Sequence, residues 1–183
     1  MHQSRDSDVH VQALELFLSD IEKRAFRIAQ LAVRNEADAL DIVQDAMIKL
    51  SFRYGSNPEA EWKPLFYKIL ENRILDHHRK ENTRRKWFFW KTTDDDEEVA
   101  VDAEAADEGQ DPLQQLQRVE LSDGLLREVE QLPVKQQQCF LLRCWEGMSV
   151  KETALAMQIT EGSVKTHYFR AIQKLLTVIG EYD

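Results

Sequence analysis

The chain has 183 residues and a formal net charge of −9 at pH 7, with 24 Lys and Arg against 33 Asp and Glu. Glycine and proline are few, and Ala, Leu, Glu, Gln and Lys dominate without the alternation typical of strands, so we expect an all-α fold. No run reaches the ~18 apolar residues of a membrane span. No basic start followed by an apolar signal-peptide core opens the chain, so we expect a cytoplasmic protein.

The first strongly patterned segment is residues 38–50, DALDIVQDAMIKL. Apolar residues recur there at steps of three and four, which predicts a helix that buries Leu40, Val43, Met47 and Leu50. The other side of this helix carries Asp38, Asp41, Gln44, Asp45, Ile48 and Lys49. This side could be a docking surface, or a solvated face on which Asp45 and Lys49 form an i,i+4 pair worth ~0.3–0.5 kcal/mol.

A second helix is predicted over residues 62–86, WKPLFYKILENRILDHHRKENTRRK, with Pro64 in its first turn. The helical period places on its buried stripe Trp62, Phe66, Ile69, Leu70 and Ile74. A different face carries Asn72, Asp76 and Arg79. Residues 73–91 contain seven basic and two acidic residues, which favours phosphate binding, although residues 84–86 could also be a solvated charge run.

Residues 91–117 contain one lysine and ten acidic residues, so most of the negative net charge belongs to this stretch. It has few large apolar side chains and cannot bury enough surface to fold alone. We therefore predict a flexible acidic linker over residues 91–112, between helical domains at residues 9–90 and 113–183. The charge leaves open whether the linker is a solubilising tether or an acidic mimic of nucleic acid.

Four consecutive aromatic residues, Trp87 to Trp90, stand at the end of the first predicted domain. If exposed, they would promote association with other molecules. They could close the first domain, pack on the second domain or meet a protein partner. The sequence does not choose among these three.

No metal site, cofactor or catalytic centre is expected. Cys139 and Cys144 fit no zinc spacing and are expected to be small buried apolar residues. His77 and His78 point in different directions on a helix. Neither a carboxylate cluster nor a catalytic triad nor a phosphate loop is present, so we predict that the protein is not an enzyme.

Residues 132–176 have the layout of a helix-turn-helix DNA-binding motif. Ser149 and Glu152 have the spacing of a capping box, which predicts a helix start near Val150. This short helix would bury Ala154, Leu155 and Met157. Thr160 is a second N-cap, and the helix after it has a predicted buried stripe of Val164, Ala171, Ile172, Leu175, Leu176 and Ile179.

Another face of that last helix carries Ser163, Thr166, His167 and Arg170, with Lys165 and Phe169 on its flanks. These hydroxyl, imidazole and guanidinium groups can bind phosphates and base edges. An ordinary solvated surface would show a similar pattern. The two caps, the short turn and the preceding LPxxxQxxFLLRxxEGMS run favour DNA binding.

The segment LPVKQQQCFLLRCWEGMSVKETALAMQITEGSVKTHYFRAIQKL resembles region 4 of bacterial sigma factors. Residues 38–50 resemble region 2.2 of the same family, and residues 62–86 resemble regions 2.3 and 2.4. The chain is most similar to the extracytoplasmic-function group, which has only these two domains. The alternatives are a LuxR-type regulator, which shares the helix-turn-helix but lacks the upstream segments, and a helical adaptor anchored by the aromatic run.

The resemblance implies promoter recognition, promoter melting and transcription initiation, with RNA polymerase core and promoter DNA as partners and an anti-sigma factor as a further one. It implies −35 contacts by Arg143, Ser163, Lys165, Thr166, His167, Phe169 and Arg170. It implies −10 contacts by Asn72, Asp76, Arg79 and Lys80. Docking on a coiled coil of the largest polymerase subunit would use Asp38, Asp41, Gln44, Asp45 and Ile48. The linker would thread through the basic active-site cleft.

The helix-turn-helix departs from the family pattern at two places. Gln158 and Ile159 stand where many relatives have a leucine-glycine turn. His167 and Tyr168 replace commoner arginine or aliphatic residues. These differences question the turn geometry and predict unusual −35 bases.

Overall fold

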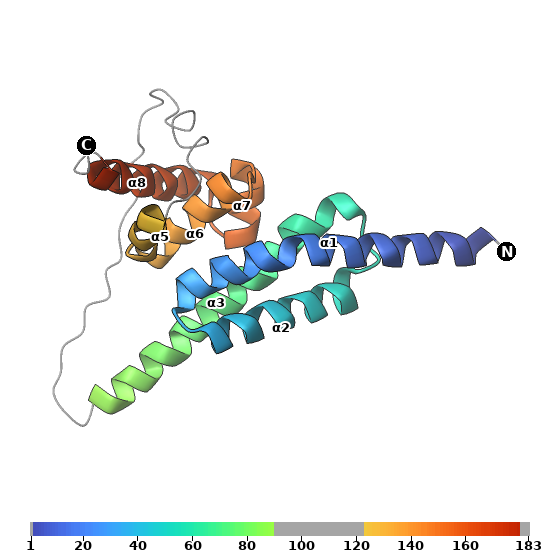
Figure 1. Ribbon diagram of the computed structural model, residues 1–183, viewed down its shortest axis with the longest axis horizontal. Helices are drawn as coiled ribbons and strands as arrows, with labels where there is room; N and C mark the ends of the chain where they lie inside the picture. Colours follow the sequence, from blue (N-terminus) through green and yellow to red (C-terminus); the bar gives the residue numbers. More distant parts are fainter. Residues whose placement is uncertain (1, 90–122, 180–183) are drawn as a thin grey trace.

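The computed structural model describes residues 2–89 and 123–179, and every regular element in those ranges is helical, as predicted (Figure 1). The first group of helices is α1 (His2–Val33), α2 (Glu36–Tyr54) and α3 (Glu59–Phe89). The second group is α5 (Asp123–Glu130), α6 (Val134–Phe140), the π-helical turn η1 (Leu141–Trp145), α7 (Val150–Met157) and α8 (Glu161–Ile179). The predicted linker, Trp90 and the side chains of the other three aromatic residues in that run lie outside the described part.

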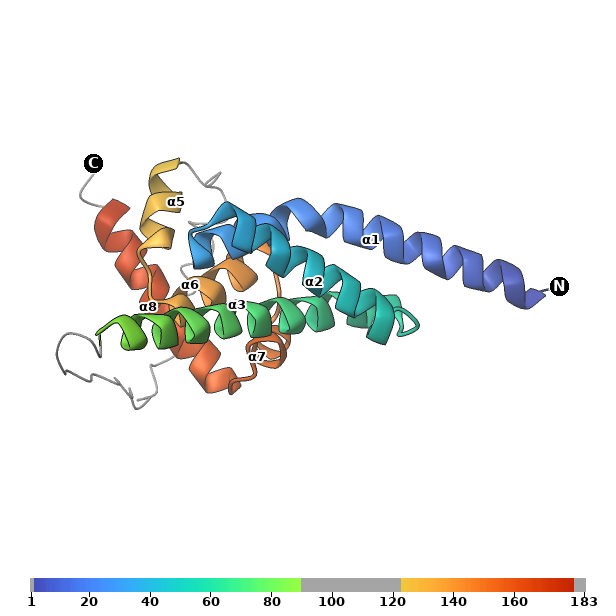
Figure 2. The ribbon, with the colours of Figure 1, turned by 90° about the horizontal axis from the view of Figure 1, so that it is seen from below.

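The helices α1, α2 and α3 form an antiparallel bundle, because short connections join consecutive helices (Figures 1 and 2). The predicted stripe of α3 is confirmed: its core residues are Trp62, Phe66, Ile69, Leu70 and Ile74. The Trp62 indole also donates to the Tyr54 carbonyl at 3.2 Å, which ties the start of α3 to the end of α2. The half of α1 nearest the N-terminus projects beyond the rest of the molecule (Figure 2).

Two details of this bundle differ from the prediction. Leu40 is 45% exposed, because α2 packs through its small and β-branched positions, which are Ala39, Ile42, Val43 and Ala46, together with Leu50. The helix α3 begins at Glu59, so Pro64 lies beyond its first turn.

In the second group, the predicted capping box is present. The Glu152 amide donates to Ser149 Oγ at 3.1 Å, the Ser149 amide donates to Glu152 Oε2 at 2.7 Å, and α7 begins at Val150. The bond from the Ser149 amide lowers the pKa of the Glu152 carboxyl. Thr160 Oγ1 accepts from the Ser163 amide at 3.1 Å, which caps α8. Leu155 is 57% exposed rather than buried, because the core positions of α7 are Thr153, Ala154, Ala156 and Met157.

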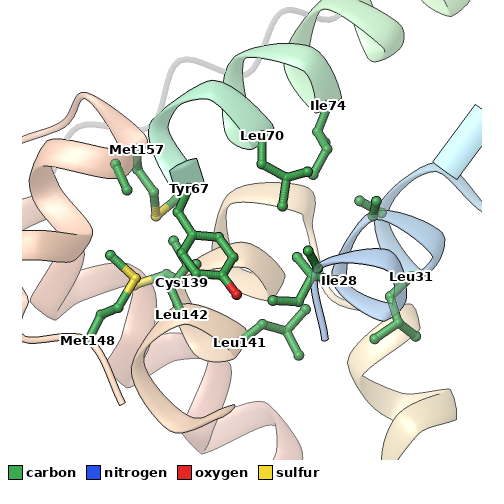
Figure 3. Close-up of a cluster of buried hydrophobic side chains, with 14 of the residues drawn as sticks. Ile28, Leu31, Tyr67, Leu70, Ile74, Cys139, Leu141, Leu142, Met148 and Met157 are labelled. Atoms are coloured by element: carbon green, nitrogen blue, oxygen red, sulfur yellow. The ribbon is translucent and has the colours of Figure 1, made fainter. Parts of the chain in front are cut away.

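The two groups of helices pack on each other: α7 lies against α3, and α5 and α6 lie against α1. Figure 3 shows one apolar cluster that draws on both, with Ile28 and Leu31 from α1, Tyr67, Leu70 and Ile74 from α3, and Cys139, Leu141, Leu142, Met148 and Met157 from the second group. A single core therefore runs through both. Among the helices of the described ranges, none combines the length and apolar character needed to cross a membrane.

Candidate nucleic-acid interface

The N-terminal half of α8 presents most of the residues expected to face DNA. Lys165 and Phe169 are exposed, and Arg170 is half-buried on the next turn. Ser163 is half-buried, and its hydroxyl lies 2.8 Å from the Thr160 hydroxyl. All four lie outside the buried stripe of α8, in the part of the helix that a helix-turn-helix presents to a groove or a phosphate.

Two predicted residues of α8 are less accessible. Thr166 is only 8% exposed, and its hydroxyl donates to the Gly162 carbonyl at 3.0 Å, so it is directed at its own helix. His167 is half-buried, and burial lowers the pKa of its imidazole, with further lowering by the charges of Lys135 and Arg170. His167 is therefore neutral at pH 7. Its Nδ1 is buried, so Nε2 is the ring nitrogen that can meet a ligand.

Arg143 lies on η1, at the entrance to the helix-turn-helix. Its guanidinium donates to the Met148 carbonyl and lies 5.5 Å from the centre of the Tyr168 ring. Tyr168 Oη also lies 3.1 Å from Cys144 Sγ. The unusual tyrosine thus connects η1 to α8 and holds the Arg143 charge beside the recognition helix.

The turn between α7 and α8 has the left-handed geometry that usually requires glycine, although glutamine stands at this position. Gln158 adopts the left-handed conformation, with φ 56° and ψ 41°, and its amide donates to the Ala154 carbonyl. A non-glycine residue in this conformation is strained relative to glycine. The Gln158 side chain leaves the turn and donates through Nε2 to Asn72 Oδ1 at 2.6 Å.

On α3, the four residues expected at the −10 element differ in their surroundings. Asp76, Arg79 and Lys80 are exposed, and Asp76 pairs with Arg79 at 3.3 Å. Asn72 is half-buried beneath Gln158. Three of the four are therefore open to solvent, and one is in contact with the helix-turn-helix.

The polar side of α2 is exposed as one face. Asp41, Gln44, Asp45 and Ile48 are exposed, whereas Asp38 is half-buried and its amide donates to the Asn35 side chain at 3.0 Å, which caps the helix. Asp45 also pairs with Arg73 of α3 at 3.5 Å.

Sequence reasoning missed Phe52, which is 88% exposed one turn beyond Ile48. The signal was available, because residues 44, 48 and 52 follow each other at steps of four.

A polar cluster between the two groups of helices was also missed. The Glu146 side chain is 1% exposed, and Arg24 Nε donates to its Oε1 at 2.9 Å while Lys63 Nζ lies 3.5 Å from its Oε2. Burial, and then the charge of Glu146, raises the pKa of the Tyr67 hydroxyl. Burial also raises the pKa of Glu71 to about 8.

Comparison with known proteins assigns both groups of helices to one family. Residues 16–84 match the model of sigma-70 region 2, and residues 122–175 match that of sigma-70 region 4. The extracytoplasmic-function (ECF) sigma factor SigM of Mycobacterium tuberculosis is 27% identical over 163 residues, which cover 86% of this chain and 72% of SigM. SigV of Bacillus subtilis, an RNA polymerase sigma factor, is 29% identical over 169 residues, covering 91% and 90% of the two chains.

A solved structure shares the fold. The sigma factor RpoE of Bartonella quintana, crystallised with the anti-sigma factor NepR, superimposes with a TM-score of 0.58 at 25% identity. The alignment covers 92% of this chain and 95% of RpoE.

The chain joins a helical region 2 domain to a region 4 helix-turn-helix domain, and this combination defines a transcription initiation factor. The chain belongs to the sigma-70 family. Within that family it is an ECF sigma factor, which directs RNA polymerase to promoters and is not an enzyme. The LuxR-type and adaptor alternatives are not favoured, because the region 2 match precedes the helix-turn-helix.

Proposed function

We propose that the chain divides its work among three surfaces: α8 reads the −35 element, α3 reads the −10 element and α2 binds the polymerase core. The observation that carries this proposal is the contrast between two faces of one bundle. The exposed face of α2 carries Asp41 and Asp45, whereas the exposed end of α3 carries Arg79 and Lys80. Only the positive charge on α3 favours contact with DNA phosphates.

The α2 surface has the composition of a protein interface. Ile48 is 56% and Phe52 88% exposed, and the acidic residues lie beside them on the same helix. An apolar centre with a polar rim is the usual anatomy of a protein–protein contact. We therefore assign Asp38, Asp41, Gln44, Asp45 and Ile48 to core polymerase and add Phe52 to them.

The −35 contacts belong to the N-terminal half of α8, which a helix-turn-helix places in the major groove. Lys165, Phe169 and Arg170 are positioned for base edges and phosphates, and Arg143 for a phosphate beside them. Ser163 and His167 can add hydrogen bonds through the hydroxyl and a ring nitrogen. Thr166 would contribute only if DNA binding turned its hydroxyl away from the Gly162 carbonyl.

The setting of the protein follows from this role. Polymerase and promoters are in the bacterial cytoplasm, and we place the chain there. RpoE of B. quintana was solved with an anti-sigma factor, and we propose a regulator of that class for this chain too. The division into residues 9–90, 91–112 and 113–183, with the acidic segment between the domains, stays a prediction.

Reconstitution with bacterial core polymerase tests the proposal. Transcripts made on genomic DNA with and without the chain are sequenced from their 5′ ends. New start sites that share two upstream elements are expected. Identical start sites in both reactions would refute the assignment of all three surfaces.

A further inference from the structure

His167 differs in charge from the basic residues around it on the proposed −35 surface. Burial, and then the charges of Lys135 on α6 and Arg170 on α8, lower the pKa of its imidazole. Lys135 is exposed and Arg170 is half-buried. The two cations suit phosphates, whereas the imidazole near them is neutral at pH 7.

The surroundings of the imidazole decide which ring nitrogen carries the hydrogen. A neutral imidazole has one N–H, so one nitrogen donates and the other accepts. Nδ1 of His167 is buried and has no hydrogen-bond partner. A hydrogen on Nδ1 would therefore be a buried donor without an acceptor, and in protein backbones such N–H groups are rarer than carbonyl oxygens with too few partners. The hydrogen accordingly belongs on Nε2, the nitrogen that can meet a ligand.

Protonation of the whole ring meets the same obstacle. It would place a charged N–H at Nδ1, where no partner is available. It would also add a positive charge near Lys135 and Arg170. Both effects oppose the charged form, so His167 presents one neutral donor through Nε2.

A single neutral donor reads less of a base pair than an arginine does. Arginine, which is commoner at this position in the family, can donate two hydrogen bonds to guanine and can also attract a phosphate. One N–H can donate to a purine N7, to guanine O6 or to thymine O4. Cytosine presents an amine donor instead and would leave Nε2 of His167 without a partner.

We propose that His167 is a specificity-determining residue of the −35 site: Nε2 donates one hydrogen bond to an acceptor atom on a base edge, and Lys135 and Arg170 bind the neighbouring phosphates. The inference rests on the proposed −35 role of α8. It adds Lys135, which sequence reasoning missed, to that surface. It also gives a physical basis for unusual −35 bases, because a single donor replaces the two parallel donors of arginine.

The position of the hydrogen is measured on the free full-length chain by NMR of the ring nitrogens, whose chemical shifts distinguish a protonated nitrogen from an unprotonated one. His167→Phe removes both nitrogens and keeps an aromatic ring, so it assigns the signals. Nε2 should carry the hydrogen at pH 7. A hydrogen on Nδ1, or on both nitrogens, would overturn the inference and leave the proposed function standing.

Base reading is measured with the full-length chain bound to bacterial core polymerase, on a promoter found by the transcript sequencing above. Each −35 base pair is changed in turn to the other three. His167→Phe should lose about fivefold of discrimination at one base pair, the effect of one hydrogen bond, and keep the preferences at the others. His167→Gln keeps an amide donor and should retain part of the discrimination, which separates loss of the donor from altered packing of the ring. Gln173→Ala, an exposed position on α8, is the matched control.

The salt dependence of the same binding separates a base contact from a phosphate contact. Lys135→Ala should reduce the slope of log affinity against log salt by about 1, His167→Phe should leave the slope unchanged, and His167→Arg should steepen it by about 1. A reduced slope in His167→Phe, or equal weakening on every promoter variant, would identify a phosphate contact and overturn base reading by His167. Full discrimination in His167→Phe would overturn it as well. An unchanged slope in Lys135→Ala would remove Lys135 from the phosphate contacts, and a wild-type complex indifferent to every −35 change would refute the proposed function of α8.

Discussion

Replacing Glu71 by glutamine should stabilise the protein and remove a dependence of its stability on pH. Glu71 is 3% exposed, and burial raises its pKa from 4.5 to about 8. The folded chain therefore holds this proton more tightly than the unfolded chain. Below pH ~4.5 the group has no effect on the free energy of unfolding, between pH ~4.5 and ~8 it lowers that free energy progressively, and above pH ~8 its effect is constant.

The size of the effect follows from the shift. Each pH unit in this window costs about 1.4 kcal/mol, so Glu71 lowers the free energy of unfolding by about 3 kcal/mol at pH 7. Glutamine has nearly the same shape and no proton to gain. Glu71→Gln should therefore be more stable than the wild type by up to about 3 kcal/mol at pH 7, with the difference growing up to pH ~8.

Urea unfolding of the full chain between pH 6.5 and 8 measures this difference. The lower limit avoids His78 and His167, because burial lowers the pKa of both and their effect on stability has the opposite sign below pH ~6.5. The neighbouring Tyr67 hydroxyl and Cys139 thiol do not titrate in this range, because burial raises the pKa of both. Glu59→Gln, an exposed position on α3, is the control. Equal pH dependence in the wild type and Glu71→Gln would refute the reasoning.

Three further predictions concern the proposed surfaces. Arg170→Ala should leave folding intact and weaken −35-dependent initiation by about 1–3 kcal/mol at one base pair, measured by run-off transcription on promoter variants; unchanged promoter choice would remove Arg170 from the site. Asp45→Lys should abolish retention of core polymerase, while the loss of its exposed Arg73 pair costs at most about 1 kcal/mol of stability; normal retention would end the docking assignment. Phe52→Ala should weaken core binding without changing the melting temperature, since Phe52 is 88% exposed; unaltered binding would exclude Phe52.

Local sequence signals predicted the helix-turn-helix well. The bonds that start α7 join Ser149 to Glu152, so their spacing is visible in the sequence. The apolar stripe of α3 was equally clear, because large side chains such as Trp62 and Phe66 occupy it. Periodicity failed at Leu40 and Leu155, where small neighbours form the close contact between helices and the larger residue is left outside.

Contacts between distant segments could not be predicted in the same way. Arg24 and Glu146 are 122 residues apart, and Asn72 and Gln158 are 86 apart. In the sequence, nothing distinguishes Glu146 from the other acidic residues, and Gln158 is notable only as an unusual residue in a turn. Their partners lie in the other group of helices, so these contacts, and the burial of Glu146, exist only after the two groups pack together.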